Sequence, residues 1–341
     1  MATSEHICID AVGVVHGGAA SILRALIAQL EHEHPQADLT VWCSPARALR
    51  FEPSGGPRVA WLERPIEHDH LPARVVWLTR ALASASQRRR ATQLYTLNGC
   101  ALAPQLPTHA LVQQGLLFNS QAAATLSPTM RARLAVLRRL LHRALPHATT
   151  VTVHTPWLAD ALLTENLTTR ERLSVAPSPQ TLCPERAPLP PAWYAIPPHA
   201  RCLYLGNDLP YKDLATAARG VRIARRDPAC RDLTLITAGP IDRPLPDALH
   251  LGLLTPPQVH EALATAACLI QPSSCESLGL PVVEALTAGC PVLVADHPWS
   301  RHVAGEQARF FTPGSAHDVA FALRALRQAD PNPRPYGHPL R

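Results

Sequence analysis

One segment of 21 residues, from Gln271 to Pro291, carries the residues best suited to chemistry: QPSSCESLGLPVVEALTAGCP. Pro281 stands where a helix is expected to begin, and Gly289 stands just past its expected end. The first turn of such a helix offers free amides and the positive end of the helix dipole, which together favour a phosphate. Gly279, in the loop before it, allows the backbone to approach a ligand closely. The pattern therefore predicts a phosphate site at this helix N-terminus.

Two carboxylates, Glu276 and Glu284, flank the predicted phosphate site. We expect Glu276 to come from the loop and Glu284 from the first turn of the helix. Carboxylates beside a phosphate suit the binding of sugar hydroxyls, from which they accept hydrogen bonds, rather than of the phosphate itself. The alternatives without a binding role are a surface carboxylate for Glu276 and, for Glu284, a solvated residue that interacts with the helix dipole.

Lys212 is the one Lys among 32 Lys and Arg residues, and it lies in the run YLGNDLPYKDL, residues 204–214. A preference for Arg codons is the plain reason for the other 31. A compact ammonium acts as a point charge toward phosphate, which gives a reason why Arg was not used here. Asp213 is a good N-cap for the helix expected to follow.

The segment around the two glutamates resembles the signature of glycosyltransferase family 4, whose members are retaining, nucleotide-sugar-dependent enzymes of the GT-B fold. The shared pattern is Pro-Ser-x-x-Glu-x-x-Gly-Leu-Pro-x-x-Glu-Ala-x-x-x-Gly-x-Pro-Val, which begins here at Pro272. It is specific because it fixes many positions together. The resemblance is strong over about residues 200–315 and weak but ordered over 1–180.

The resemblance implies a donor site in the C-terminal half and no cofactor or metal, since the nucleotide-diphosphate sugar is a substrate. It assigns catalytic roles to Lys212, at the diphosphate, and Glu276, at the sugar, and it places Glu284 at the ribose. It implies further donor contacts from Gly206, Asn207, Ser277, Leu278, Gly279 and Leu280. Gly17 and Gly18, with His16 beside them, resemble a glycine loop close to the donor or the acceptor.

Two positions depart from the family pattern. Asn207 follows Gly206 where the family usually has Arg, so either another residue such as Arg243 supplies the second charge or phosphate binding is weaker. In the N-terminal half, Gln113 or Gln114 stands where many members carry a His that faces the sugar.

The elements that must position these residues alternate between strand and helix, which favours an α/β class with two Rossmann-like, doubly wound domains facing each other across a cleft. Strands are expected at 6–10, 39–43, 110–112, 150–153, 202–205, 233–237, 268–270 and 291–295. Helices are expected at 20–30, 73–86, 129–145, 156–164, 214–226, 256–266, 281–288 and 316–329, with Gly17 and Gly18 in the loop before the first. The domains are expected at 1–180, for the acceptor, and 201–330, for the donor, with a Pro-rich linker at 181–200 and a loose tail at 331–341.

The composition excludes several other classes of protein. The chain has 341 residues, of which 47% are hydrophobic, and no apolar run is long enough for a spanning helix. Nine scattered Cys without a C-x-x-C pair argue against a disulfide framework or a zinc ribbon, so we expect a cytoplasmic protein, with peripheral attachment to the inner face of the membrane left open. The net charge of +6 allows anionic partners, but no recognition motif for nucleic acid accompanies it.

Three features have a second interpretation. The clusters at 31–34 and 67–70 contain His, Glu and Asp, but they lie near Pro in expected turns, and no metal site is predicted. Cys275 has no base placed beside it by the sequence, so it is not expected to be a nucleophile. Residues 70–150 contain ten Arg and no Asp or Glu. Their helix at 130–145 is either an ordinary packed helix with a solvated basic face or a contact with an anionic membrane surface.

The sequence thus predicts a glycosyltransferase that moves a hexose from a nucleotide-diphosphate donor to a hydroxyl of a saccharide or lipid-linked acceptor, in the synthesis of a bacterial cell-surface polysaccharide or glycolipid. Two alternatives stay open: a non-catalytic protein that binds nucleotide sugars, motivated by Asn207, and a nucleotide-sugar 2-epimerase of the GT-B fold. The sequence does not specify which sugar is transferred, which base the donor nucleotide carries, or which acceptor is used.

Overall fold

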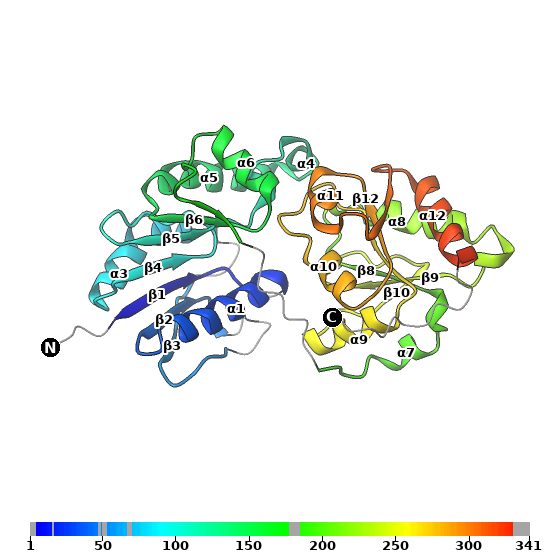
Figure 1. The fold of residues 1–341 in the computed structure, drawn as a ribbon, viewed down its shortest axis with the longest axis horizontal. Helices are drawn as coiled ribbons and strands as arrows, with labels where there is room; N and C mark the ends of the chain where they lie inside the picture. Colours follow the sequence, from blue (N-terminus) through cyan, green and yellow to red (C-terminus); the bar gives the residue numbers. More distant parts are fainter. Residues whose placement is uncertain are drawn as a thin grey trace. The chain divides into compact units, whose positions relative to one another are not determined.

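The computed structural model describes residues 5–15, 17–46, 49, 53–66, 70–176 and 185–329. The chain divides into two compact units, residues 1–118 with 127–180 and residues 119–126 with 181–341. Each unit is built around one parallel sheet (Figure 1). The expected α/β class is therefore confirmed. The sequence boundary at 180 does not anticipate that residues 119–126, which include helix α4 (Ser120–Ala124), group with the second unit.

The first unit holds a seven-stranded parallel sheet in the order β3-β2-β1-β4-β5-β6-β7. The strands are β1 (His6–Ala11), β2 (Asp38–Cys43), β3 (Val59–Glu63), β4 (Gln93–Thr96), β5 (Thr108–Leu111), β6 (Thr150–Val153) and β7 (Leu173–Val175). The helices are α1 (Gly17–Glu33), α2 (Leu71–Val76), the π-helical turn η2 (Trp77–Ala81), α3 (Leu82–Arg88), α5 (Pro128–Ala144) and α6 (Pro156–Thr164).

The second unit holds a six-stranded parallel sheet in the order β10-β9-β8-β11-β12-β13. The strands are β8 (Arg201–Leu205), β9 (Thr234–Ala238), β10 (Ala248–His250), β11 (Cys268–Gln271), β12 (Val292–Ala295) and β13 (Ala308–Phe311). Besides α4, the helices are α7 (Pro191–Tyr194), α8 (Leu214–Ala224), α9 (Pro256–Thr265), α10 (Leu280–Thr287), α11 (Pro298–Ala304) and α12 (Ala316–Ala329).

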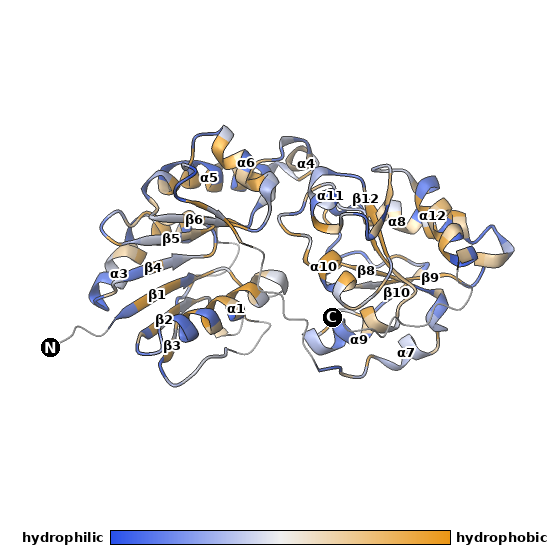
Figure 2. Cartoon of the chain, viewed as in Figure 1, coloured by the Kyte–Doolittle hydropathy of each residue, from blue (hydrophilic) through white to orange (hydrophobic). Residues whose placement is uncertain are grey.

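Burial explains which strands the sequence predicts. The central strands β8, β11 and β12 are buried along their whole length, and apart from Arg201 and Gln271 at their ends they appear in the sequence as apolar runs, as the hydropathy colour of β12 shows (Figure 2). By contrast, β7 and β10 have three residues each and are partly exposed, and both lie at sheet edges. Those two, together with β3, β4 and β13, were not predicted from the sequence, because short or half-buried strands carry little periodic signal.

Helix ends follow local chemistry. Asp213 caps α8 by accepting a hydrogen bond from the Thr216 amide, as the sequence predicts. The expected helix at 73–86 is instead three consecutive segments, α2, η2 and α3, which together reach from Leu71 to Arg88. Gly17 and Gly18 belong to the first turn of α1 and not to the loop before it, which corrects the sequence prediction.

The basic helix α5 is packed into the first unit. Leu137, Leu140 and Leu141 are buried in the core, and Leu134 packs against it. Arg138 donates a hydrogen bond of 2.6 Å to Glu165, which also lies 3.0 Å from His142. The apolar face of α5 is therefore not available for insertion into a bilayer, while its other face is solvated. Among the residues that the structure describes, every helix is too short or too polar to cross a membrane.

Two predicted segments fall wholly or partly outside the described residues. The whole tail 331–341 lies outside them, and so do residues 181–184 of the Pro-rich segment. In the described remainder of that segment, 185–200, the chain forms only the single-turn helix α7 and a 3-10 turn at Pro198–Ala200.

Candidate functional site

The candidate site of the second unit lies where its strand order reverses. β8 and β11 are neighbours in the sheet, and their connections run to opposite sides. Ligands of doubly wound sheets bind beyond the carboxyl ends of such a strand pair. The loop after β8 contacts the loop after β11, because Ser274 donates from its amide to the Tyr211 carbonyl at 2.8 Å. The site is thus assembled from two segments more than 60 positions apart in sequence.

An ion pair between Lys212 and Glu276 occupies this junction. Lys212 Nζ donates to Glu276 Oε1 at 2.5 Å, and the two side chains are only 13% and 12% exposed. Gln271, at the end of β11 and fully buried, donates to the same oxygen at 2.9 Å and to Ser273 Oγ at 3.0 Å. Glu276 is therefore held between an amide and an ammonium, and its orientation is fixed by both.

The charge of Lys212 survives its burial. Desolvation is the largest single effect and lowers the pKa of this ammonium, but Glu276 together with Tyr211 and Cys275 outweighs it, so the pKa stands above its ordinary value. Lys212 also lies 5.4 Å from the centre of the Tyr211 ring, within the range of a cation–π contact. Its bond to Glu276 uses one of three N–H donors, which leaves a positive charge with spare donors next to the helix that starts at Leu280.

Gly206 and Gly239 allow the chain segments that follow β8 and β9 to approach each other closely. A Cβ on Gly239, whose φ is +137°, would stand 2.1 Å from the Gly206 carbonyl oxygen. The Gly206 amide donates to the Ala238 carbonyl at 3.0 Å, which holds the ends of β8 and β9 together. Gly206 is therefore placed at the carboxyl end of β8 as predicted, and Gly239 is a required partner.

Asn207 serves its own loop. Its Oδ1 accepts from the Leu209 amide at 3.2 Å, and its carbonyl accepts from the hydroxyl of the buried Tyr204 at 2.5 Å. Asp208 Oδ2 accepts from the amides of Asp242 and Arg243 at 3.1 and 3.2 Å, so this loop and the one after β9 lie side by side. Arg243, the candidate for the second charge, is thus adjacent to the loop that carries Lys212, with an exposed side chain.

The N-terminus of α10 is fixed by packing. Gly279 is its N-cap in the left-handed region with φ +68°, and a Cβ there would stand 2.5 Å from the Trp299 ring. Within the same helix start, Leu280 and Pro281 form the first positions, and Leu278 is buried. Ser277 stands between Glu276 and Leu278 with its side chain half-buried. The predicted donor contacts 277–280 therefore follow Glu276 directly at one helix end.

Glu284 lies in the second turn of α10, because the helix begins at Leu280 and its first turn has no acidic residue. This corrects the expectation of the first turn. Burial raises the pKa of Glu284 to about 7, and no hydrogen bond or ion pair to its carboxylate is found among the described residues. An unpaired, half-buried carboxylate is costly, so a ligand that donates hydrogen bonds to it would relieve that cost.

Cys275 does not have the properties of a nucleophile. Its side chain is buried, and burial first, then the neighbouring Glu276 charge, raises the pKa of the thiol to about 12. Only the thiolate attacks, so a thiol that keeps its proton near neutral pH is unreactive.

The N-terminal candidates are placed only in part. Gly17 is exposed with φ +65° and Gly18 is half-buried, at the start of α1, whereas His16 lies outside the described residues. Gln114 donates to Asn98 Oδ1 at 3.2 Å, and Gln113 has a buried Nε2 without an acceptor. Both glutamines follow β5 at the carboxyl edge of the first sheet.

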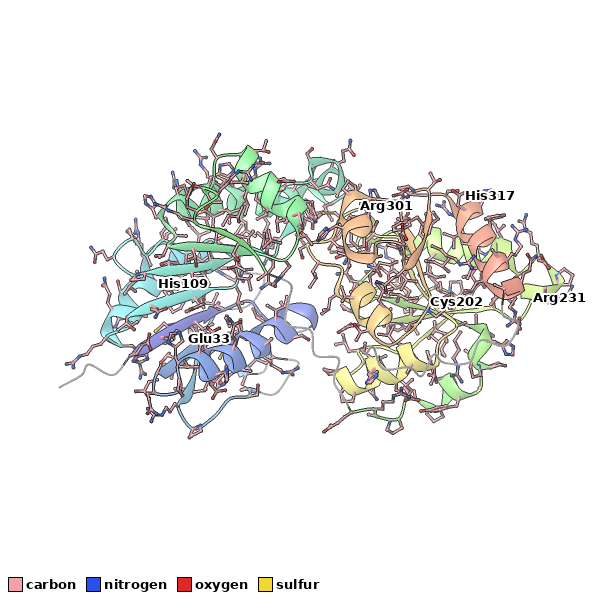
Figure 3. The ribbon with its side chains drawn as sticks, viewed as in Figure 1. Glu33, His109, Cys202, Arg231, Arg301 and His317 are labelled. Carbon is pink, nitrogen blue, oxygen red and sulfur yellow. The ribbon has the colours of Figure 1, made fainter. Side chains whose placement is uncertain are left out.

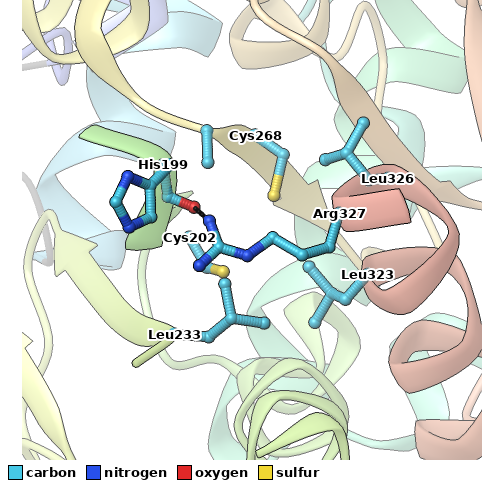
Figure 4. A pocket seen from close by; sticks show the side chains of 8 residues that line it. His199, Cys202, Leu233, Cys268, Leu323, Leu326 and Arg327 are labelled. Atoms are coloured by element: carbon cyan, nitrogen blue, oxygen red, sulfur yellow. Dashed lines mark hydrogen bonds between the residues drawn. The ribbon is translucent and has the colours of Figure 1, made fainter. Parts of the chain in front are cut away.

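Two further features bear on the candidate site: the distribution of metal-ligating side chains and a small hollow in the second unit. In the described part of the chain, His, Cys, Asp and Glu side chains form no group of three able to hold a metal ion; of the cluster 67–70, residues 67–69 are not described. A small hollow of about 10 Å³, close to one water-sized sphere, lies at the amino ends of β8 and β11, away from Lys212, with Cys202, Cys268 and Arg327 in its wall (Figure 4). Cys202 is seen within the second sheet in Figure 3.

Sequence reasoning missed three residues of this site: Gln271, Tyr211 and Trp299. The signal for Gln271 was present, since an amide side chain at the end of a buried apolar strand needs a partner. Trp299 contacts Gly279 from a helix that begins after the next strand, and nothing local in the sequence announces that contact.

Comparison with known protein families gives one match, which lies in the second unit. Residues 245–334, about a quarter of the chain, match the family model described as Glycosyl transferases group 1. That span includes Glu276 and Glu284 but not Lys212. No curated protein matches the sequence.

Solved structures share the fold over nearly the whole chain. WaaG, a glycosyltransferase involved in lipopolysaccharide biosynthesis, aligns with a TM-score of 0.69 at 15% identity, covering 96% of this chain and 91% of that one. HepE from Anabaena, in complex with UDP and glucose, gives 0.66 at 14% identity, covering 96% and 91%. A putative UDP-N-acetylglucosamine 2-epimerase from Listeria monocytogenes gives 0.63 at 14% identity, covering 99% and 93%. The fold is therefore GT-B, as predicted, and identities this low establish the fold alone.

Proposed function

We propose that the protein is a retaining glycosyltransferase that transfers a hexose from a nucleotide-diphosphate donor to a hydroxyl of a saccharide or lipid-linked acceptor. The observation that carries the proposal is the Lys212–Glu276 pair at the strand-order reversal of the second sheet. Glu276 lies four residues before the start of α10 and within the group 1 match, whereas Lys212 lies outside that match. This combination supplies a cation, the positive end of a helix dipole, and a carboxylate that can accept hydrogen bonds from sugar hydroxyls.

In the proposed mechanism, Lys212 and the N-terminus of α10 stabilise the charge that develops on the leaving diphosphate. Lys212 stays protonated, because its surroundings, with Glu276 foremost among the groups that favour the charge, raise its pKa. Positive groups that are already in place stabilise the transition state strongly, because neither they nor the solvent must reorganise as negative charge develops. Glu276 accepts hydrogen bonds from the sugar hydroxyls, and Glu284 accepts them from the ribose. Asn207 and Gly206 contribute backbone close to the diphosphate, and no metal is required.

Retention is proposed to follow a front-face route, in which donor phosphate helps to deprotonate the acceptor hydroxyl. Glu276 is committed to Lys212 and Gln271, which suits an orienting group better than a nucleophile. Cys275 keeps its proton. Gly17 and Gly18, at the N-terminus of α1, are proposed to lie near the donor or the acceptor.

We also propose that the enzyme acts in the cytoplasm, in the synthesis of a bacterial surface polysaccharide or glycolipid, and that α5 meets an anionic membrane surface. The support is the exposed row Arg131, Arg139 and Arg143, opposite the buried leucines. Because the apolar face is in the core, such a contact is electrostatic and weakens as salt increases.

The central experiment measures donor binding, donor hydrolysis and transfer for the wild type, Lys212→Ala, Lys212→Arg and Glu276→Ala. Thermal shifts with UDP, GDP, ADP, CMP and dTDP first identify the base. Removing the ammonium should lower kcat/KM by about a hundredfold or more, as the loss of one preorganised charge-stabilising donor does. Lys212→Arg should restore little, because a planar fork does not replace a point charge at a site shaped around it.

A stability control is necessary because each single variant leaves a buried charge without its partner, at a cost of about 3–5 kcal/mol. The double variant Lys212→Met/Glu276→Gln removes both charges and should regain most of that stability while staying inactive. Recovery of activity in the double variant would contradict the catalytic roles. Wild type that binds nucleotide yet neither hydrolyses nor transfers would establish the non-catalytic alternative, and epimer formed without acceptor would establish the epimerase.

A further inference from the structure

We propose that the first unit contains its own binding site for an oxyanion, a phosphate or carboxylate group of a small-molecule ligand, built around the buried guanidinium of Arg74. All of its residues belong to the first unit, and the proposal stands whether or not the proposed transfer reaction is correct. Its parts are Arg74 on α2, Asp10 at the end of β1, and Gly13 in the loop between β1 and α1.

Arg74 is an unusual residue to find enclosed. It is 4% exposed, yet no hydrogen bond from its guanidinium to any described residue is found, and its Nε is buried without an acceptor. A guanidinium stays charged at any ordinary pH and carries five N–H donors. Burying it unsatisfied is unfavourable, so the fold leaves a strong demand for an acceptor at this point. Among its three nitrogens, Nε is the one found buried without a hydrogen-bond partner.

Gly13 makes room for that guanidinium. A Cβ on Gly13 would stand 1.5 Å from Arg74 Nη1 and 2.6 Å from its Cζ, and Gly13 has a φ of +91°. Both the space and the backbone conformation therefore require glycine. The Gly13 amide donates to Ser44 Oγ at 2.9 Å, which anchors the loop beneath the guanidinium. The loop is shaped so that Arg74 reaches the carboxyl edge of the sheet.

The nearby carboxylate does not satisfy Arg74. Asp10 is 1% exposed, and its Oδ1 accepts from the Trp77 indole at 2.9 Å and from the Val12 amide at 3.4 Å. Its Oδ2 has no partner, and the pair is not within ion-pair distance among the described residues. Burial raises the pKa of Asp10, and the Arg74 charge opposes that rise. Asp10 instead holds the start of η2, directly after α2, through its hydrogen bond with Trp77.

The location is one where ligands bind. β1 and β4 are neighbours at which the strand order of the first sheet reverses, and Arg74 lies against the loop that leaves β1. The next element, α1, has 17 residues and no acidic residue in its first turn, so its positive dipole end is not neutralised from within. A guanidinium and a helix N-terminus at one edge together favour a planar or tetrahedral oxyanion.

The test separates the two units with local readouts. Titrations with inorganic phosphate, glycerol 3-phosphate and UDP are followed by calorimetry and by hydrogen exchange in peptides covering residues 9–26 and 205–215. The variants are Arg74→Gln, Arg74→Lys, Gly13→Ala and Lys212→Ala, and the matched control is Arg80→Gln, an exposed Arg in the same helical segment. Gly13→Ala displaces the guanidinium without removing its charge, so it tests the site even where Arg74→Gln fails to fold.

We expect phosphate or glycerol 3-phosphate to protect residues 9–26 in the wild type, in Lys212→Ala and in Arg80→Gln. In Arg74→Gln and Gly13→Ala the affinity should fall at least about tenfold, the usual effect of losing a charged hydrogen-bond donor, with partial rescue by Arg74→Lys. UDP should protect 205–215 and depend on Lys212. Phosphate affinity unchanged in both Arg74→Gln and Gly13→Ala, or protection confined to 205–215, would overturn the proposal. UDP failing to bind would count against the proposed donor site only.

Discussion

Replacement of Glu284 by Gln should make the protein more stable and less able to bind its donor. The carboxylate is half-buried in the second turn of α10, and burial raises its pKa from 4.5 to about 7. The folded protein therefore binds a proton between these two pH values that the unfolded chain has already lost. By linkage, the free energy of unfolding decreases as pH rises from about 4.5 through about 7 and stays reduced above it.

The magnitude follows from the same two values. Their difference, at about 1.4 kcal/mol for each pH unit, gives an upper bound of about 3.5 kcal/mol for the cost of the charged form at pH 8. Residual solvent contact screens the carboxylate, so we expect about 2 kcal/mol. Gln keeps the shape without the charge and should recover this amount at pH 8, which raises Tm by about 4–8 °C, and should recover nothing near pH 4.

Thermal unfolding of the wild type and Glu284→Gln between pH 4 and 8.5 measures the effect, and nucleotide titration at pH 8 measures the cost to binding. An amide donates where a carboxylate only accepts, so affinity for the nucleoside part should fall about tenfold. A stability difference that does not change with pH, or a variant less stable than wild type at pH 8, would refute the assignment of an unpaired, buried charge to Glu284.

Two further predictions concern the same unit. Gly239→Ala should lower the free energy of unfolding by about 3 kcal/mol in urea, because its Cβ would stand 2.1 Å from the Gly206 carbonyl oxygen at φ +137°. The matched control Gly252→Ala, at φ +72° with nothing within 4 Å, should lower it by only about 1 kcal/mol. Equal losses would contradict the close approach of Gly239 to Gly206. Cys275→Ala should keep transfer activity within about threefold of the wild type. The wild type should resist inactivation by iodoacetamide at pH 8, because the pKa of the Cys275 thiol is about 12. Rapid inactivation of the wild type, absent in Cys275→Ala, would show a reactive thiol instead.

Local features of the sequence were sufficient for much of the fold. Asp213 before α8 and Pro281 with Gly289 around α10 mark helix ends, because caps depend on neighbouring residues. The buried strands β8, β11 and β12 appear as apolar runs. The edge strands β7 and β10 were missed, since their stability comes from pairing with a neighbour and not from their own pattern.

The sequence by itself determined the α/β class, the buried central strands and the ends of several helices, and it predicted a set of residues for a nucleotide sugar. Tertiary structure alone decided that Lys212 meets Glu276 across 64 positions, and that Gln271 holds the same carboxylate oxygen. It also decided that Glu284 is half-buried with no partner among the described residues, and that Gly13 accommodates a guanidinium from α2. The physical reason is that caps and periodicity act between neighbours along the chain, whereas burial and charge pairing depend on which distant segments pack together.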